Sequence, residues 1–207
     1  MLEREEPRDA LVSTSGEPFN RLPCGARLGT SSARRRSQLL RQRSDLELLE
    51  IRGNVDTRLR KLDEGQYDAI VLAACGLIRL GMGARITECL PMEMMLPEPG
   101  QGALAVEARA DDDETLELLG GLNDPTSRGC IEAERAFLRA LGGGCRVPIA
   151  AYGSVQEGEL VLQGAVIAAD GHAQVRGTMR APLAESSALG ERLAQQLAAQ
   201  GAKALLA

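Results

Sequence analysis

The stretch Ala26-Arg27-Leu28-Gly29-Thr30-Ser31-Ser32-Ala33-Arg34-Arg35 decides the fold. Its first four residues predict a short strand. The residues after the polar turn predict a helix over 32–42, which either Ser31 or Ser32 can cap. The same pattern then repeats, with a strand over 46–51, a helix over 55–64 and a buried strand over 69–73. Strands that alternate with helices in this way are typical of parallel βαβ units, so we expect an α/β domain.

The second half of the chain has a different pattern of predicted strands and helices. Two prolines and two glycines interrupt regular structure over 96–102, and we interpret this run as a crossing between lobes. The pattern beyond it predicts a strand over 103–108 and a helix that begins near 111–114. A second helix is predicted from Asp124-Pro125 to about Leu141. Strands follow over 146–152, 160–168 and 174–180, with a hairpin turn at Asp170-Gly171 between the last two, and a helix over 183–200 comes last. We therefore expect a small α+β domain of three strands and two helices at the end.

Composition narrows the function. The 207 residues carry a net charge of −5, but residues 27–61 hold ten basic and four acidic side chains and are locally +6. A basic site on an acidic protein favours a small polyanion as ligand, and an aromatic content of 2% disfavours a surface that stacks nucleobases. Five widely spaced cysteines and one histidine predict reduced thiols, with neither a disulfide framework nor a metal site. The charged first residues and the lack of a long apolar run predict a cytoplasmic protein without a membrane span.

Two strand-to-helix corners concentrate the positive charge. Arg34 and Arg35 fall in the first turn of a helix, where the helix dipole disfavours cations by roughly 0.3–1 kcal/mol each. An anion bound at the helix start would compensate. Arg52-Gly53-Asn54-Val55-Asp56-Thr57-Arg58 forms the second corner, where Gly53 allows a positive φ or a close backbone approach, Asn54 can cap the helix and Arg58 lies one helical turn further. Neighbouring corners should face one cleft. The alternative stays open that these arginines are solvated and bind nothing.

Cys145 follows three glycines in Gly142-Gly143-Gly144-Cys145-Arg146-Val147-Pro148. Glycines leave the thiol accessible, and Arg146 would favour the thiolate. A free cysteine can equally be a small buried hydrophobe, so both interpretations remain open on the residues alone. We expect the other four cysteines to lie in the core.

Taken together, these motifs resemble one family, porphobilinogen deaminase, also called hydroxymethylbilane synthase. The resemblance covers the whole chain, and its blocks occur in the family's order: Pro7-Arg8-Asp9-Ala10, Gly29 to Arg35, Arg52 to Leu59, Tyr67-Asp68-Ala69-Ile70-Val71-Leu72-Ala73, Pro99-Gly100-Gln101-Gly102-Ala103 and Gly143-Gly144-Cys145-Arg146-Val147-Pro148-Ile149.

The resemblance implies a transferase of haem and tetrapyrrole biosynthesis that joins four porphobilinogen molecules to hydroxymethylbilane and releases ammonia. It implies a covalent dipyrromethane cofactor, held through a thioether to Cys145. It further implies cofactor and substrate binding by a set of residues from the corners and the crossing: Thr30, Ser31, Ser32, Arg34, Arg35, Arg52, Gly53, Asn54, Arg58, Ala73, Gln101 and Gly102. The implied fold is a periplasmic-binding-protein-like βα domain over 1–96, a hinge and return segment of a truncated first domain over 97–123, and the α+β domain over 124–207 that carries the cofactor cysteine.

The resemblance stops at the catalytic acid. The family's catalytic aspartate lies in a part of its first domain that has no counterpart here, so no catalytic residue is identified. We expect a truncated chain that binds polycarboxylates weakly and does not turn over porphobilinogen alone. Its expected partners are porphobilinogen and linear polypyrroles, without nucleic acid or membrane, and the expected state is a monomer unless another chain supplies the missing segment. The alternative is a non-catalytic polycarboxylate-binding or anion-binding module.

Overall fold

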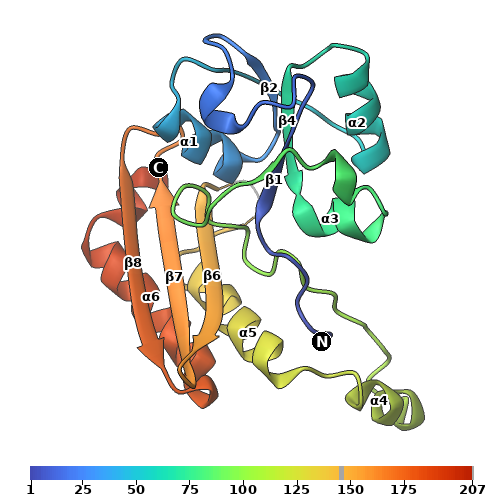
Figure 1. Ribbon diagram of the computed structural model, residues 1–207. Coiled ribbons are helices and arrows are strands. Elements are labelled where there is room, and N and C mark those ends of the chain that lie inside the picture. The colour runs from blue at the N-terminus through green and yellow to red at the C-terminus, as the bar shows by residue number, and fades with distance from the viewer. Residues whose placement is uncertain (145–146, 207) are drawn as a thin grey trace.

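The computed structural model describes residues 1–144 and 147–206, which form two sheets with their own helices (Figure 1). The first sheet has the order β3-β2-β4-β1-β5, and the second has the order β6-β7-β8. The first half holds β1 (Asp9–Ser13), β2 (Arg27–Gly29), α1 (Ala33–Gln42), β3 (Glu47–Leu49), α2 (Val55–Asp63), β4 (Ala69–Ala73), α3 (Ala74–Arg79) and β5 (Glu88–Cys89). The second half holds α4 (Asp113–Gly120), α5 (Pro125–Ala140), β6 (Ile149–Gln156), β7 (Glu159–Ile167), β8 (Gln174–Ala181) and α6 (Ser186–Ala199).

The first sheet is covered on both faces, because β4 and the middle of β1 (Ala10, Leu11 and Val12) are apolar and buried. On one face, Leu11 and Val71 pack with Leu39 of α1. On the other face, Ile70 packs with Leu59 of α2, in the same cluster as Leu77 of α3. Successive side chains of a strand point to opposite faces, so one apolar strand serves both layers. The carboxyl ends of β2 and β4 thereby meet the starts of α1 and α3 along one edge.

This sheet is mixed, whereas the sequence pattern predicts parallel units. Strands β2, β3 and β4 are parallel, as predicted. Strand β1 was not predicted, and it lies antiparallel to both β4 and β5. The signal for β1 is the short apolar run Ala10-Leu11-Val12, which follows a strongly charged segment.

The second sheet is an antiparallel meander, and α5 and α6 pack on one of its faces. Its three strands, its two helices and the hairpin between β7 and β8 agree with the predicted α+β domain. Phe137 of α5 is fully buried, and its ring lies against Gly164 of β7, where an added Cβ would come within 2.6 Å. The opposite face packs Ala165 and Ile167 against Leu96 of the first half. Leu96 therefore joins the two halves through an apolar contact.

The predicted strand over 103–108 is wrong. In the structure this run belongs to no sheet, and among its residues only Leu104 bonds through its backbone to the N-terminal segment, by accepting from the Leu2 amide at 3.3 Å. A strand needs neighbours on which to pair, and the side chains of Leu104 and Val106 remain exposed. Figure 1 shows this segment and the N-terminal segment leading away from the first sheet, with α4 at the far end.

The three-segment division at 96–97 and 123–124 stays a prediction. Among residues 1–144 and 147–206, no helix is long and apolar enough to cross a membrane.

The prediction of four core cysteines is wrong for Cys24, which is exposed, while Cys75 and Cys130 are buried and Cys89 is half-buried.

Candidate anion-binding site

One cavity of about 290 Å³ lies where the two predicted corners meet. Residues from four elements line it: Arg35, Gly53, Asn54, Val55, Arg58, Leu72, Ala73 and Gly76. Five of the sequence-predicted site residues are in this set, from α1, α2, β4 and the loop before α2. The parallel strands bring these corners together because their carboxyl ends share one edge of the sheet.

The first corner is held by its hydroxyl groups. Ser32 caps α1 and accepts from the Arg35 amide at 3.3 Å. Thr30 is buried and accepts from the Ser32 amide, so its hydroxyl supports the turn. Ser31 bonds to both backbone groups of Ile51 and so ties this corner to the second one. All three hydroxyls have a structural task here, and their contact with a ligand stays a prediction.

Arg34 finds its anion inside the protein. Its guanidinium is 2% exposed and donates to the Asp9 carboxylate at 2.6 Å, with a longer contact to Glu98 at 3.2 Å. It also donates to the Leu96 carbonyl at 2.7 Å. The cation that seemed out of place at a helix start is therefore compensated by Asp9. Sequence reasoning expected a ligand in that place.

Arg35 shares the same carboxylate but reaches the cavity. Its side chain is 11% exposed, and its Nε donates to Asp9 at 2.9 Å. Burial alone would raise the pKa of Asp9, but Arg34 and Arg35 outweigh burial and lower that pKa below its ordinary value. Asp9 is therefore a carboxylate with two cationic partners, and sequence reasoning assigned it no role. A single acid in a charged terminal segment looks like a surface residue.

The second corner follows its predicted design. Gly53 has a φ of 123°, which residues with a side chain rarely adopt, and an added Cβ would lie 2.7 Å from the Thr57 side chain. Asn54 caps α2 by accepting from the Thr57 amide at 2.9 Å. Arg58 lies one turn further, and its Nε donates to the Gly53 carbonyl at 2.7 Å. The loop and the helix thus aim Arg58 at the cavity.

Two like charges, Arg35 and Arg58, face this cavity, and the part of its lining that the structure describes contains no acidic residue. Burial lowers the pKa of the Arg58 guanidinium from its ordinary value, and the nearby Arg35 lowers it further. Arg35 and Arg58 repel each other across this cavity, an arrangement that an anion could stabilise. A bound carboxylate would relieve that repulsion and accept hydrogen bonds from both side chains.

The remaining predicted residues lie outside this cavity. The Arg52 side chain is 82% exposed and pairs with Glu50. Gln101 joins the buried network, donating to the Pro7 carbonyl at 2.7 Å and to Asp9 at 3.0 Å. Gly102 is buried, and its carbonyl accepts from Arg79 at 2.7 Å. Ligand binding by these residues stays a prediction.

Cys145 lies outside the described residues, together with Arg146. The glycines before it have a packing reason that sequence analysis missed. A Cβ on Gly143 would come within 2.6 Å of Ile149 and 2.7 Å of Leu138. The glycine run is therefore required, in part, by the core of the second half.

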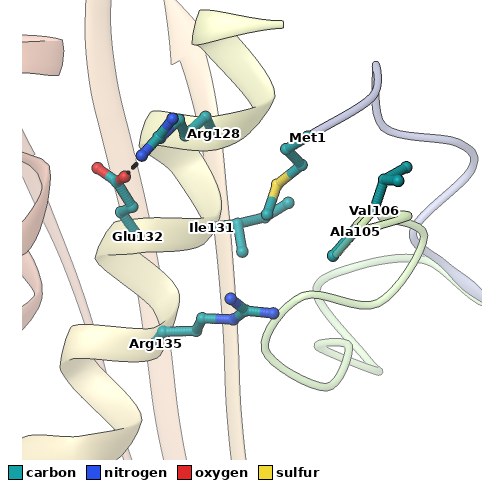
Figure 2. Close-up of a pocket in the computed structure, with 7 residues that line it drawn as sticks. All are labelled: Met1, Ala105, Val106, Arg128, Ile131, Glu132 and Arg135. Carbon is teal, nitrogen blue, oxygen red and sulfur yellow. Dashed lines mark hydrogen bonds and ion pairs between the residues drawn. The ribbon is translucent and has the colours of Figure 1, made fainter. Parts of the chain in front are cut away.

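A further cavity of about 220 Å³ lies between α5 and the segment around Val106. Figure 2 shows Arg135 reaching across it toward that segment, while Arg128 turns to Glu132, with which it pairs at 2.9 Å. Met1 and Ile131 supply an apolar floor. Of the site residues that the sequence predicted, none of those that the structure describes lines this cavity.

A second buried ion pair links the two halves. Arg4, in the N-terminal segment, pairs with Glu134 of α5, which is fully buried and also accepts from the amides of Gly100 and Gly153. Arg4 in addition lies over the Tyr152 ring, 5.0 Å from its centroid. Among the described residues, no group of three or more His, Cys, Asp or Glu side chains could hold a metal ion.

Comparison with known proteins agrees with these features. Residues 1–117 match the family model described as "Porphobilinogen deaminase, dipyromethane cofactor binding domain", and residues 129–199 match "Porphobilinogen deaminase, C-terminal domain". The curated porphobilinogen deaminase of Roseiflexus castenholzii is 54% identical over 204 residues, which cover 99% of this chain and 67% of that protein. Those of Syntrophotalea carbinolica and Chlorobaculum tepidum are 50% and 46% identical, and the matches cover 65% and 66% of their lengths. This chain thus spans about two thirds of the length of these relatives, and it belongs to the porphobilinogen deaminase family.

Proposed function

We propose that this chain serves the hydroxymethylbilane synthase reaction, in which four porphobilinogen molecules are joined head to tail with release of ammonia. One observation carries the proposal. Arg35 and Arg58 face one cavity at the carboxyl edge of the sheet, and none of the described residues that line it is acidic. Porphobilinogen and its oligomers carry acetate and propionate groups, and a guanidinium group can bind such a carboxylate through two parallel hydrogen bonds.

The cavity fits the carboxylates of a dipyrromethane cofactor. At about 290 Å³ it lies near the lower end of small-molecule sites, which span roughly 300–1,000 Å³. Arg35 and Arg58 would hold carboxylates, and Leu72 offers an apolar wall to a pyrrole ring. We propose Cys145 as the covalent anchor, by resemblance to the family. When bound, the cofactor supplies the pyrrole to which substrate units are added.

The residues of this chain contribute binding and orientation. Arg58 is held from behind by Gly53, and Arg35 is held by Asp9, so both cations are fixed before a ligand arrives. Fixed groups place a reactant without losing freedom at the moment of reaction. The start of α2, capped by Asn54, adds its dipole to the attraction for anions. We propose no general acid within this chain, and we place the protein, as a monomer, in the cytoplasm.

The first test is binding. Calorimetry with porphobilinogen should show binding to the wild-type chain and a loss of about tenfold or more in affinity for Arg58→Gln, because about 1.4 kcal/mol corresponds to tenfold. Arg60→Gln is the matched control, because Arg60 lies on the same helix but pairs with Glu64 and does not line this cavity. Equal affinity in wild type and Arg58→Gln would contradict the proposed site.

The second test is the covalent anchor. Intact-mass analysis with peptide mapping should place a dipyrromethane-sized addition on the peptide that contains Cys145. Cys24 is exposed and serves as an internal control for nonspecific thiol modification. An addition that maps to Cys24, or equally to both peptides, would contradict attachment at Cys145. Binding of porphobilinogen without any covalent addition or turnover would favour a plain anion-binding module.

A further inference from the structure

Asp9 is the point where several parts of the first half converge. It is the first residue of β1, it is fully buried, and it pairs in register with Ala73 of β4. Its carboxylate accepts from Arg34 at 2.6 Å, from Arg35 at 2.9 Å and from Gln101 at 3.0 Å. Buried carboxylates are costly unless they are paired and hydrogen-bonded in this way.

Only one of these partners lines the cavity. Arg34 is closed off at 2% exposure, Gln101 turns to the Pro7 carbonyl, and Arg35 alone reaches the cavity wall. Two nitrogens of Arg35 contact Asp9, and its remaining NH1 donates to the Val71 carbonyl at 3.3 Å. The direction of the Arg35 guanidinium is therefore set mainly by Asp9.

Arg35 needs such a hold because of what it faces. Arg58 presents a second positive charge to the same cavity. Two like charges in a partly buried site repel, and without a counter-ion Arg35 would turn away toward solvent. Asp9 supplies that counter-ion from behind, where it is not accessible to a ligand.

We propose that Asp9 is a positioning residue, which fixes Arg35 so that one ligand carboxylate meets Arg35 and Arg58 together. This assignment rests on the proposed function, since it concerns the same cavity. Asp9 touches no ligand and acts through Arg35. Gln101 extends the arrangement to the segment between the two halves, because its backbone carbonyl accepts from Arg4, the partner of Glu134.

A double-mutant cycle tests this role. Asp9→Asn, Arg35→Gln and the combined variant are titrated by calorimetry with two probes, porphobilinogen and succinate. Asp9→Asn should weaken binding about tenfold or more in the wild-type background and less than about twofold in the Arg35→Gln background, because coupled residues are not additive. The NMR signal of the Arg35 Nε proton should be protected from solvent exchange in the wild type and lose that protection in Asp9→Asn. Asp68→Asn is the matched control, since Asp68 also holds an arginine, Arg27, but does not line the cavity.

The possible outcomes separate the two claims. An equal loss for Asp9→Asn in both backgrounds overturns the positioning role. If succinate binds and porphobilinogen does not, the proposed function fails, and Asp9 is judged on the succinate cycle. If neither probe binds the wild type, both claims are overturned. If Asp9→Asn does not fold, the double variant Asp9→Asn/Arg34→Gln takes its place, because it also removes the buried Arg34 charge that has lost its partner. This double variant should show the same tenfold loss of affinity relative to Arg34→Gln. The loss should disappear when Arg35→Gln is present in both proteins.

Discussion

Replacing Asn54 by aspartate should separate the stability of this protein from its ability to bind anions. Asn54 caps α2 through its side-chain oxygen, which accepts from the Thr57 amide at 2.9 Å. A carboxylate makes the same cap, and the helix dipole favours a negative charge at this end by roughly 0.3–1 kcal/mol. Asn54→Asp should therefore fold as well as the wild type or slightly better.

The same substitution should weaken the binding of anions. Asn54 lines the cavity together with Arg35 and Arg58, so the new charge either repels the ligand carboxylate or takes its place on the arginines. Two unit charges about 4 Å apart interact with about 1 kcal/mol in water and about 4 kcal/mol at an effective dielectric constant of about 20. The cavity is open to solvent on one side, so the loss should fall between these limits, from about fivefold to about a thousandfold.

Two assays read the two effects. Thermal unfolding measures the cap, and calorimetry with porphobilinogen measures the site. Asn54→Ser keeps a neutral cap and should change neither strongly, whereas Asn54→Ala should lose about 1 kcal/mol of stability. Affinity of Asn54→Asp within twofold of the wild type would refute the placement of the anion at this cavity. A large drop in its melting temperature would refute the role of Asn54 as the cap.

Further predictions follow from other described contacts. Gly53→Ala should lower the free energy of unfolding by about 1–3 kcal/mol, because the φ of 123° strains any side chain and Thr57 blocks the new Cβ; denaturant unfolding measures this. Phe137→Ala should cost about 3–5 kcal/mol in the same assay, since it empties the core of the second half. Asp9 has a lowered pKa in the folded protein, so its contribution to stability is present above the ordinary carboxyl pKa and is lost as pH falls through the folded one. Asp9→Asn should therefore cost about 3–5 kcal/mol near neutral pH and less in acid, and equal costs at pH 7 and pH 3 would contradict the ion pair.

The parts that sequence could predict are those whose causes are local. Gly53 and Asn54 were predicted with their roles, because a positive φ and a helix cap depend on a few neighbouring residues. The helix that begins after Asp124 was predicted for the same reason. The alternation of strands and helices likewise predicted β2, β3 and β4 and their parallel orientation, since a helix between two strands of one sheet ordinarily returns the chain to a parallel strand.

The parts that sequence could not predict depend on distant partners. Arg34 was correctly identified as a cation in need of an anion, but the anion is Asp9, which lies 25 positions earlier in the chain. The run 103–108 has the apolar content of a strand, yet a strand forms only where a neighbour offers its edge. The exposure of Cys24 could not be predicted either, because it depends on the conformation of a short loop in the folded protein.

The turn between β7 and β8 has a consequence for anyone who inserts a tag or reporter into this protein. Hairpin tips are ordinarily the safest places for an insertion, because their backbone is exposed. Gly171, however, lies against α1, where an added Cβ would come within 2.7 Å of the Ser37 carbonyl and the Arg41 amide. This hairpin tip packs against α1 of the first half, so an insertion there would separate the two halves. In the turn between β6 and β7, an added Cβ on Gly158 would meet no atom within 4 Å, so this turn is the better of the two hairpin tips for an insertion.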